Sequence, residues 1–263
     1  IQCSGRPSGE GLGRFFRVRF PRTVRRHAGF VAAAVLVLAL GILTGWRLTL
    51  EEPERFYSFV DDSIAQGRTP SSSTEELRDA LYKTGDPPGD PEDSGDDPYG
   101  LGAFASFPFT HNAQVGLLSF ALGFAAGVPV LFLLFSNGLV VGAFAALYQS
   151  RGLGFELWAW LLPHGVSELA AVCLCGAAGL IVGASLVFPG PHSRLQNLAI
   201  QGRSAALLVL GAMFMLLLAG ALEGAFRQAV HDPAVRLAVA AVTFLGWLLY
   251  FLLAGRHADD PPS

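Results

Sequence analysis

The sequence contains little charge: Asp, Glu, Lys and Arg make up 15% of its 263 residues, whereas 52% are hydrophobic. Five long stretches contain no charged residue at all, namely 28–46, 113–150, 169–192, 204–222 and 237–255. An apolar run of about 18 residues or more is long enough to cross a bilayer as a helix. A soluble helical bundle would instead carry a polar stripe on each helix. The composition therefore predicts an all-α, polytopic integral membrane protein.

Several chemical signatures are also missing. The three cysteines do not make a disulfide framework, and Cys173 and Cys175 point to nearly opposite sides of one helix, so we expect no metal between them. The chain has no His-Glu-x-x-His zinc motif, no Gly-x-Ser-x-Gly turn and no glycine-rich phosphate loop. The aspartates of 51–100 lack the spacing of a calcium loop. We predict no cofactor, no metal site and no enzymatic activity.

Basic residues are concentrated before the first apolar run. Seven arginines lie there: Arg6, Arg14, Arg17, Arg19, Arg22, Arg25 and Arg26. Cytoplasmic flanks of membrane helices are rich in Arg and Lys, which predicts that segment 1–27 is cytoplasmic. Its alternation of Arg and Phe suits anionic lipid headgroups better than a nucleic acid. Because the chain begins with Ile1 rather than Met, we expect further native residues before it.

The segment 51–111 follows the first predicted span, 28–50, and should be extracytoplasmic. Its part from 51 to 100 holds fourteen of the 21 acidic residues and only four basic ones. Ser73 and Glu76 form a capping-box pattern that predicts a short helix over 74–83. Residues 84–100 are rich in Gly, Pro and Asp, which predicts a solvated, disordered linker in this outer acidic loop.

Residues 112–255 are predicted to form a five-crossing membrane core, followed by a cytoplasmic tail, 256–263. The uncharged run 113–150 has 38 residues, or about 57 Å of helix. It therefore either crosses the membrane twice, with a break at Gly127 and Pro129, or forms a re-entrant hairpin.

A second break is predicted at Pro163 and Gly165. The preceding stretch "FELWAWLL" is too short to span and carries two tryptophans, which favour the headgroup level. It predicts an interfacial or re-entrant helix before Pro163-His164-Gly165. A crossing from 166 to 188 and two more, joined by a turn at "HDP", complete about six transmembrane helices. Both termini should then be cytoplasmic, in a multi-pass protein of the cell membrane.

Polar residues interrupt these apolar spans at a few positions. The predicted layout gathers most of them near the outer leaflet: Asn112, His164, Glu168, Glu223 and Arg227. Charged side chains at membrane depth are costly, so they usually face partners or a water-filled cavity. We expect Glu223 to pair with Arg227, since they lie at i and i+4, and His164 to hydrogen-bond Glu168. Asn137 should form an interhelical hydrogen bond.

Small residues recur at four-residue spacing. The pairs are Gly123 and Gly127, Gly138 and Gly142, Gly179 and Gly183, and Gly220 and Gly224. Such spacing predicts close packing of helices, and between copies of the chain it would allow a homo-oligomer.

Five segments occur together in an order that is typical of one family. They are "FTHNAQVGLLSFALGF", "LFSNGLVVGAFAALY", "LLPHGVSELAAV", "CGAAGL" and "ALEG". With them the chain resembles the stage II sporulation protein M family of integral membrane proteins, over roughly Arg14 to Arg256. In that family two asparagines commonly stand where this chain has His111 and Asn112. The sporulation member works in a membrane complex with two peptidoglycan-degrading partners during forespore engulfment, as a scaffold rather than a hydrolase.

The resemblance thus implies a non-catalytic membrane scaffold of an envelope-associated complex, whose partners are the lipid bilayer and other membrane or envelope proteins. It does not imply sporulation for this chain. A transporter or permease subunit is the alternative, based on the intramembrane Glu168, Glu223 and Asn137 and on the predicted helix breaks. An intramembrane enzyme is a third reading, because His164 and Glu168 share one helix face.

Overall fold

The computed structural model describes residues 9–82, 101–230 and 232–256, without the side chains of 9–10, 101–110 and 223–229. Every regular element in this part of the chain is a helix. Five are long and apolar enough to cross a membrane: α3 (Ala28–Glu51), α8 (Val128–Ser150), α9 (Gly154–Val187), α10 (Arg194–Ala229) and α11 (Pro233–Leu253). These helices confirm the predicted class, an all-α polytopic membrane protein.

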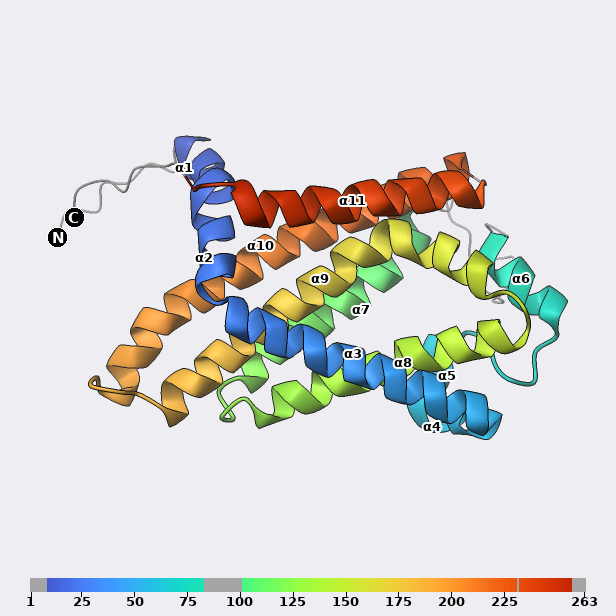
Figure 1. The fold of residues 1–263 in the computed structure, drawn as a ribbon, viewed down its shortest axis with the longest axis horizontal. Coiled ribbons are helices and arrows are strands. Elements are labelled where there is room, and N and C mark those ends of the chain that lie inside the picture. Colours follow the sequence, from blue (N-terminus) through green and yellow to red (C-terminus); the bar gives the residue numbers. More distant parts are fainter. Residues whose placement is uncertain (1–8, 83–100, 231, 257–263) are drawn as a thin grey trace.

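A further long helix, α7 (Leu101–Leu122), lies beside α9 and α10. Figure 1 shows α3, α7, α8, α9, α10 and α11 running between the same two ends of the molecule, each reversing the direction of the one before it. α9 lies at the centre and packs against the other five. It is therefore the most buried of the apolar helices.

The start of α7 differs from the sequence-based boundary. We expected the loop to continue to residue 111, but α7 begins at Leu101. Residues 101–110 carry no charge and are mostly apolar, which suits a membrane helix, and α7 continues through Pro108. As a consequence, Asn112 lies near the middle of α7 instead of opening it.

The expected helix break at Pro163 and Gly165 does not occur, because α9 is continuous through both. Proline removes one backbone hydrogen bond, here to the carbonyl of Ala159. Membrane helices tolerate this where neighbouring helices surround the site, and Pro163 is buried. Figure 1 shows the N-terminal portion of α9 inclined to the remainder, as a proline inside a helix commonly causes. The interfacial helix expected before Pro163 is therefore the first part of α9 itself.

The other expected break is present. Gly127 has a φ of +77° and directly precedes α8, which carries Pro129 in its first turn. A positive φ suits glycine, which has no Cβ to clash, and proline fits the start of a helix. The run 113–150 is thus divided between two long helices, α7 and α8.

Residues 53–82, which we call the outer cap after their predicted extracytoplasmic position, fold onto the ends of α8 and α9. The cap contains the short elements η2 (Pro53–Arg55), α4 (Phe56–Phe59), α5 (Asp62–Ala65) and α6 (Thr74–Tyr82). Its apolar side chains form a core with the two long helices: Phe56, Val60, Ala65, Leu77, Leu81, Tyr148, Leu153 and Leu157. The predicted capping box is formed, since Ser73 N–H donates to Glu76 Oε2 (2.7 Å) and Glu76 N–H donates to Ser73 Oγ (3.2 Å). The linker predicted over 84–100 lies outside the described residues.

Glycine pairs bring helix backbones into contact at two crossings. Where α3 crosses α8, a Cβ on Gly45 would meet the carbonyl of Leu139, and one on Gly142 would meet that of Ile42. Where the end of α7 crosses α9, Gly123 lies against Gly179 and Gly183 against Gly127. Three of the four predicted glycine pairs therefore lie at close helix crossings within the chain. Gly224 of the fourth pair lies among the residues whose side-chain surroundings are not described.

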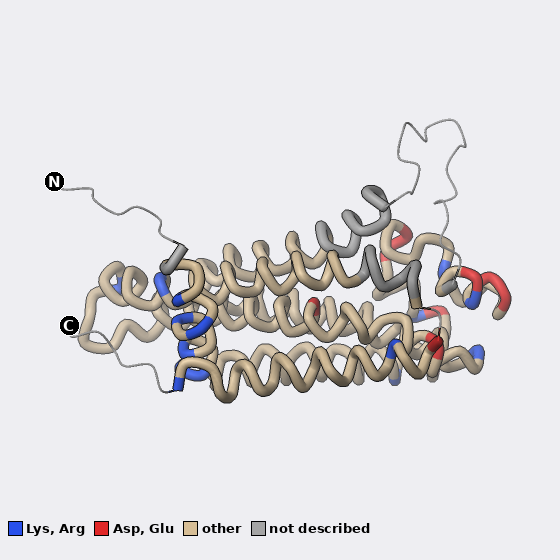
Figure 2. Tube along the Cα trace, turned by 90° about the horizontal axis from the view of Figure 1, so that it is seen from above, with Lys and Arg blue, Asp and Glu red and all other residues tan. Residues whose placement is uncertain are grey.

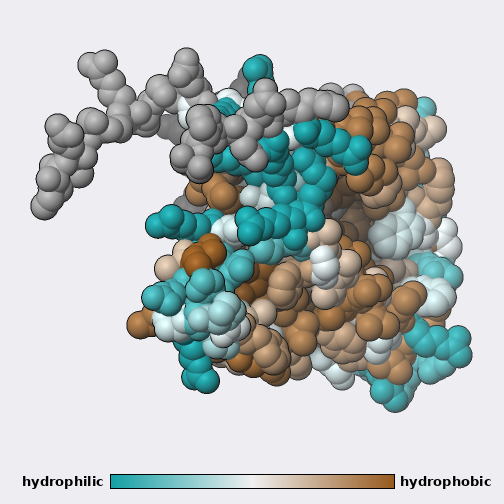
Figure 3. Space-filling view, turned by 60° about the vertical axis from the view of Figure 1, so that its left-hand side comes forward, coloured by the Kyte–Doolittle hydropathy of each residue, from teal (hydrophilic) through white to brown (hydrophobic). Residues whose placement is uncertain are grey.

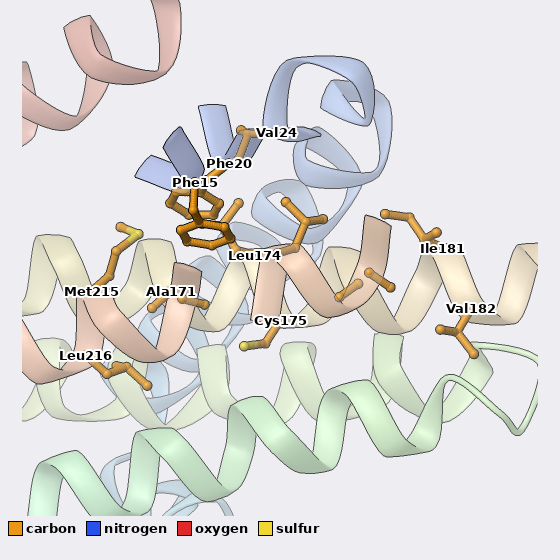
Figure 4. Packing of buried hydrophobic residues seen from close by; sticks show 14 residues of the cluster. Phe15, Phe20, Val24, Ala171, Leu174, Cys175, Ile181, Val182, Met215 and Leu216 are labelled. Carbon is orange, nitrogen blue, oxygen red and sulfur yellow. The ribbon is translucent and has the colours of Figure 1, made fainter. Parts of the chain in front are cut away.

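The N-terminal segment lies across the bundle at a steep angle to α3 and α11 (Figure 1). It consists of α1 (Gly9–Arg14), the π-helix η1 (Phe15–Arg19) and α2 (Phe20–Arg26). Figure 4 shows Phe15, Phe20 and Val24 in one cluster with side chains of α9 and α10. Figure 2 shows many arginines at the end where α2 meets the end of α11, and most of the described acidic residues, with further arginines among them, at the opposite end.

Candidate functional site

Buried polar residues gather on one stretch of α9. His164 and Glu168 are each 6% exposed, and Ser167 is 1% exposed. At 1.5 Å per residue, Glu168 lies about 21 Å from the start of α9, and Asn112 about 17 Å from the start of α7. Because α7 has 22 residues, Asn112 lies about halfway along it. We call His164, Ser167, Glu168 and Asn112, together with the tryptophans that contact them, the α9 polar site. The outer-leaflet position expected for it from the sequence stays a prediction.

The α9 polar site joins two helices through a carboxyl group. Asn112 Nδ2 on α7 donates a hydrogen bond of 3.0 Å to Oε2 of Glu168. A carboxyl group inside an apolar bundle loses its hydration, which costs several kcal/mol unless other donors replace the water. The amide of Asn112 is one such donor. The hydrogen bond therefore fixes α7 against α9 at this depth.

Two further contacts surround the carboxyl group. Trp247 Nε1 on α11 donates to Ser167 Oγ at 2.9 Å, which ties a third helix to the same turn of α9. The imidazole of His164 meets the edge of the Trp160 ring, with the ring centroids 5.5 Å apart. His164 and Glu168 lie one turn apart on the same helix, but the described contacts do not test the hydrogen bond predicted between them.

The remaining polar candidates do not join this site within the described part of the chain. Asn137 is half-buried on α8, and none of the described hydrogen bonds involves its side chain. Glu223 and Arg227 belong to α10, but their side chains lie outside the described residues, so their pairing stays a prediction. Among these polar candidates, the described contacts show a direct hydrogen bond between Asn112 and Glu168.

The comparison with protein families decides the identity of the chain. The model of the family described as Stage II sporulation protein M matches residues 32–226. The chain belongs to this family. Neither a curated protein nor a solved structure matches it.

The stage II sporulation protein M match covers most of the α9 polar site but not all of it. Asn112, His164 and Glu168 lie inside the matched range, whereas Trp247 on α11 lies beyond its end. The N-terminal segment that precedes α3 also lies outside. The matched range therefore contains both residues of the hydrogen bond between α7 and α9, whereas α11 contributes its contact from outside that range.

Sequence reasoning missed Ser167, Trp247 and Trp160 as members of the site. A tryptophan in the interior of an apolar span is a usable signal, because its indole N–H usually finds a partner when it is buried. Ser167 stands next to Glu168 and offers a hydroxyl on the neighbouring side of α9. The tertiary pairing of the two, across eighty positions of sequence, could not be read from the pattern.

The chemistry open to the α9 polar site follows from its groups. A buried carboxyl beside an amide can accept hydrogen bonds when ionised, or hold a proton when neutral. The described residues contain no group of three or more His, Cys, Asp or Glu side chains that could hold a metal ion. The contacts join α7, α9 and α11, which is a structural task, and the site holds two buried ionisable groups, His164 and Glu168.

Proposed function

We propose that the chain is a non-catalytic membrane scaffold of an envelope-associated protein complex, located in the cell membrane with both termini in the cytoplasm. Membership of the stage II sporulation protein M family supports this role. The single observation that carries it is the outer cap, which is folded and fastened to the bundle. A scaffold needs a surface that holds its shape when a partner binds, and a rigid site lowers the entropic cost of binding.

Polar contacts stabilise the outer cap, in addition to the packing of its apolar core. Arg68 donates to the carbonyls of Ala65 and Ile64, at 3.0 and 2.9 Å, and its guanidinium lies 5.0 Å from the ring centroid of Phe144. Burial lowers the pKa of this guanidinium. Arg151, just after α8, donates to the carbonyl of Pro70 at 2.6 Å. The connection between α5 and α6 is therefore held to the bundle, by the contact of Arg68 with Phe144 and by the hydrogen bond of Arg151 to Pro70.

The orientation rests on the distribution of charge. Among the described residues, arginines dominate the end where α2 meets the end of α11, and acidic residues dominate the end with the outer cap (Figure 2). Positive residues favour the cytoplasmic side. The cap thus faces the outside, where envelope partners are available. The partner class is another membrane or envelope protein, and a homo-oligomer through helix faces is a further proposal.

Photo-crosslinking inside intact cells tests the scaffold role. A photoreactive phenylalanine analogue replaces Tyr57 or Glu75, both exposed on the cap, or Phe244, which is exposed on α11. We expect both cap positions to give adducts with the same protein at comparable yield, whereas position 244 gives mainly lipid adducts. Adducts with unrelated proteins, or none at either cap position, would contradict the proposal.

The α9 polar site favours a second candidate, a transporter or permease subunit. An ionisable residue deep in a membrane bundle is often part of a substrate or ion path. The two candidates are distinguished in a strain that lacks this protein and has a measurable growth or envelope defect. Variants of the protein are compared by how well they correct that defect. If Glu168→Gln restores the strain as well as the natural sequence, while cap substitutions that abolish crosslinking do not, the scaffold role stands. The reverse outcome, with normal amounts of folded protein, assigns the function to the polar site.

A further inference from the structure

The N-terminal segment and the C-terminal end of α11 bring three arginines together. Arg22 Nε donates to the carbonyl of Gly255 at 2.8 Å, and Arg25 Nη1 donates to the carbonyl of Phe251 at 2.6 Å. Arg256 follows directly and is exposed. We call Arg22, Arg25 and Arg256 the terminal arginine cluster. Two of its members complete the last turn of α11, where carbonyl groups lack partners inside the helix.

The position of the cluster is held by packing beneath it. Phe20 lies on Gly211 of α10, since a Cβ there would meet its ring, and its centroid is 5.5 Å from that of Phe251. The hydroxyl of Tyr250 donates to the carbonyl of Phe16 at 2.6 Å. Gly255 has a φ of +72° and contacts the backbone of η1. The guanidiniums are thus presented by a packed junction of three elements.

The charges of the cluster repel one another. Partial burial, and then the guanidiniums of Arg256 and Arg22, hold the pKa of Arg25 below its usual range. The hydrogen bond to Phe251 uses one of the five N–H donors of Arg25, and arginine donors match the oxygens of a phosphate. An anion at this position would reduce the repulsion and occupy further donors.

Apolar surface lies next to the charges. Leu252 and Leu253 on the last turn of α11 are 44% and 56% exposed. Figure 3, in which the end with the termini is turned forward, shows hydrophilic residues gathered beside hydrophobic surface on that end. A ligand that fits both has a phosphate at one side and hydrocarbon at the other. Free phosphate would interact only with the arginines and would leave the apolar surface of Leu252 and Leu253 uncovered.

We propose that the terminal arginine cluster binds the headgroup phosphate of an anionic phospholipid, whose acyl chains lie along the last turns of α11. The N-terminal segment crosses the bundle instead of following its axis (Figure 1), which suits a helix at the level of the headgroups. The bound lipid would also hold the N-terminal segment against the end of α11, because the same guanidiniums contact both. This binding is independent of the scaffold proposal.

Native mass spectrometry of the purified full chain tests the binding. The full chain is used because two aspartates follow Arg256 in the sequence, outside the described residues. Phosphatidylglycerol or phosphatidylcholine with identical acyl chains is added to the protein in detergent, and the retained lipid is counted. We expect phosphatidylglycerol to be retained at least about fivefold better, since one basic residue near an anionic surface contributes about that factor.

Matched variants locate the site. Arg256→Gln should weaken phosphatidylglycerol binding about fivefold, and Arg256→Lys should keep most of it. Arg194→Gln removes the same charge from an exposed position at the start of α10 and should change binding less than about twofold. Thermal unfolding of each variant checks that it is folded. Equal retention of the two lipids, equal loss in Arg194→Gln, or displacement by millimolar inorganic phosphate would each overturn the proposal, the last by showing a simple anion site.

Discussion

At the scale of single residues, the hydrogen bond from Asn112 to Glu168 is the contact most open to measurement. Asn112→Ala removes the donor and leaves the buried carboxyl with one hydrogen bond fewer. We expect it to lower the free energy of unfolding by about 0.6 to 2 kcal/mol, the range found for interhelical hydrogen bonds in membranes. Unfolding of the purified protein in mixed detergent and dodecyl sulfate micelles measures the change.

Asn137 supplies a control for this substitution. It is also a half-buried asparagine on a long apolar helix, but it takes part in none of the described hydrogen bonds. Asn137→Ala should therefore cost less than about 0.5 kcal/mol. The double variant Asn112→Ala with Glu168→Gln should lose less than the sum of the two single losses, because residues in contact do not add. Additive losses would show that the two side chains do not interact.

At the scale of elements, the crossing of α3 and α8 depends on the absence of side chains. Gly45→Ala places a methyl group against the backbone of Leu139, and a backbone cannot move aside as a flexible side chain can. We expect a loss of about 1 to 3 kcal/mol, as for overpacked cores. Gly246→Ala on α11 meets nothing within 4 Å, so it should be neutral or stabilising by up to about 1 kcal/mol. The comparison fails if both glycines respond alike in the same unfolding assay.

The capping box of α6 gives the outer cap a dependence on pH. Hydrogen bonds from the backbone N–H of Ser73, and then from its side chain, lower the pKa of the Glu76 carboxyl from 4.5. A lowered pKa in the folded state stabilises the helix fully above pH 4.5, and this stabilisation is lost as the pH falls through the lowered value. Hydrogen exchange of Thr74–Tyr82 should therefore become faster below that pH, after correction for the intrinsic rate.

Glu76→Gln separates the titration from the cap itself. Glutamine can make the same reciprocal hydrogen bonds but does not ionise, so its α6 should exchange at a rate that is independent of pH in this window. Ser73→Ala removes one side of the box and should cost about 1 kcal/mol at neutral pH. An unchanged pH dependence in Glu76→Gln would assign the effect to another carboxyl group of the cap.

The same elements show how far the sequence could predict this structure. Ser73 and Glu76, or Asp232 before Pro233, are local signals, and both helix starts are formed as their residues indicate. Pro163 is also a local signal, but surrounding helices override it, because neighbouring groups and small adjustments of the helix can satisfy the carbonyl that proline leaves without its usual partner. The sequence could predict that Asn112 and Glu168 lie near each other only by counting membrane crossings, which decides whether the two residues come to the same side of the bilayer. The contact of Trp247 with Ser167 depends on which faces of α9 and α11 meet, which no local pattern encodes.

At the scale of the whole molecule, the charge asymmetry predicts the topology. A variant without Cys3 keeps Cys173 and Cys175, which are buried. A new cysteine at Ser71, exposed on the outer cap, should react with a membrane-impermeant maleimide added to intact cells. A cysteine at Ser193, exposed between α9 and α10, should react only after the cells are opened. Labelling of position 193 from outside would reverse the proposed orientation.

The contact between η1 and α11, near the two ends of the chain, has a consequence for the order of events during biosynthesis. The Tyr250 hydroxyl and the Phe16 carbonyl that it binds are 234 positions apart. At about 5 to 20 residues per second, the ribosome needs roughly 12 to 47 s to make the residues between them. During this interval the N-terminal helix has no α11 to bind, and its aromatic side chains can rest only on lipid or on helices already inserted. The junction is therefore the last contact to close, and a chain that stalls before α11 leaves its first helix undocked.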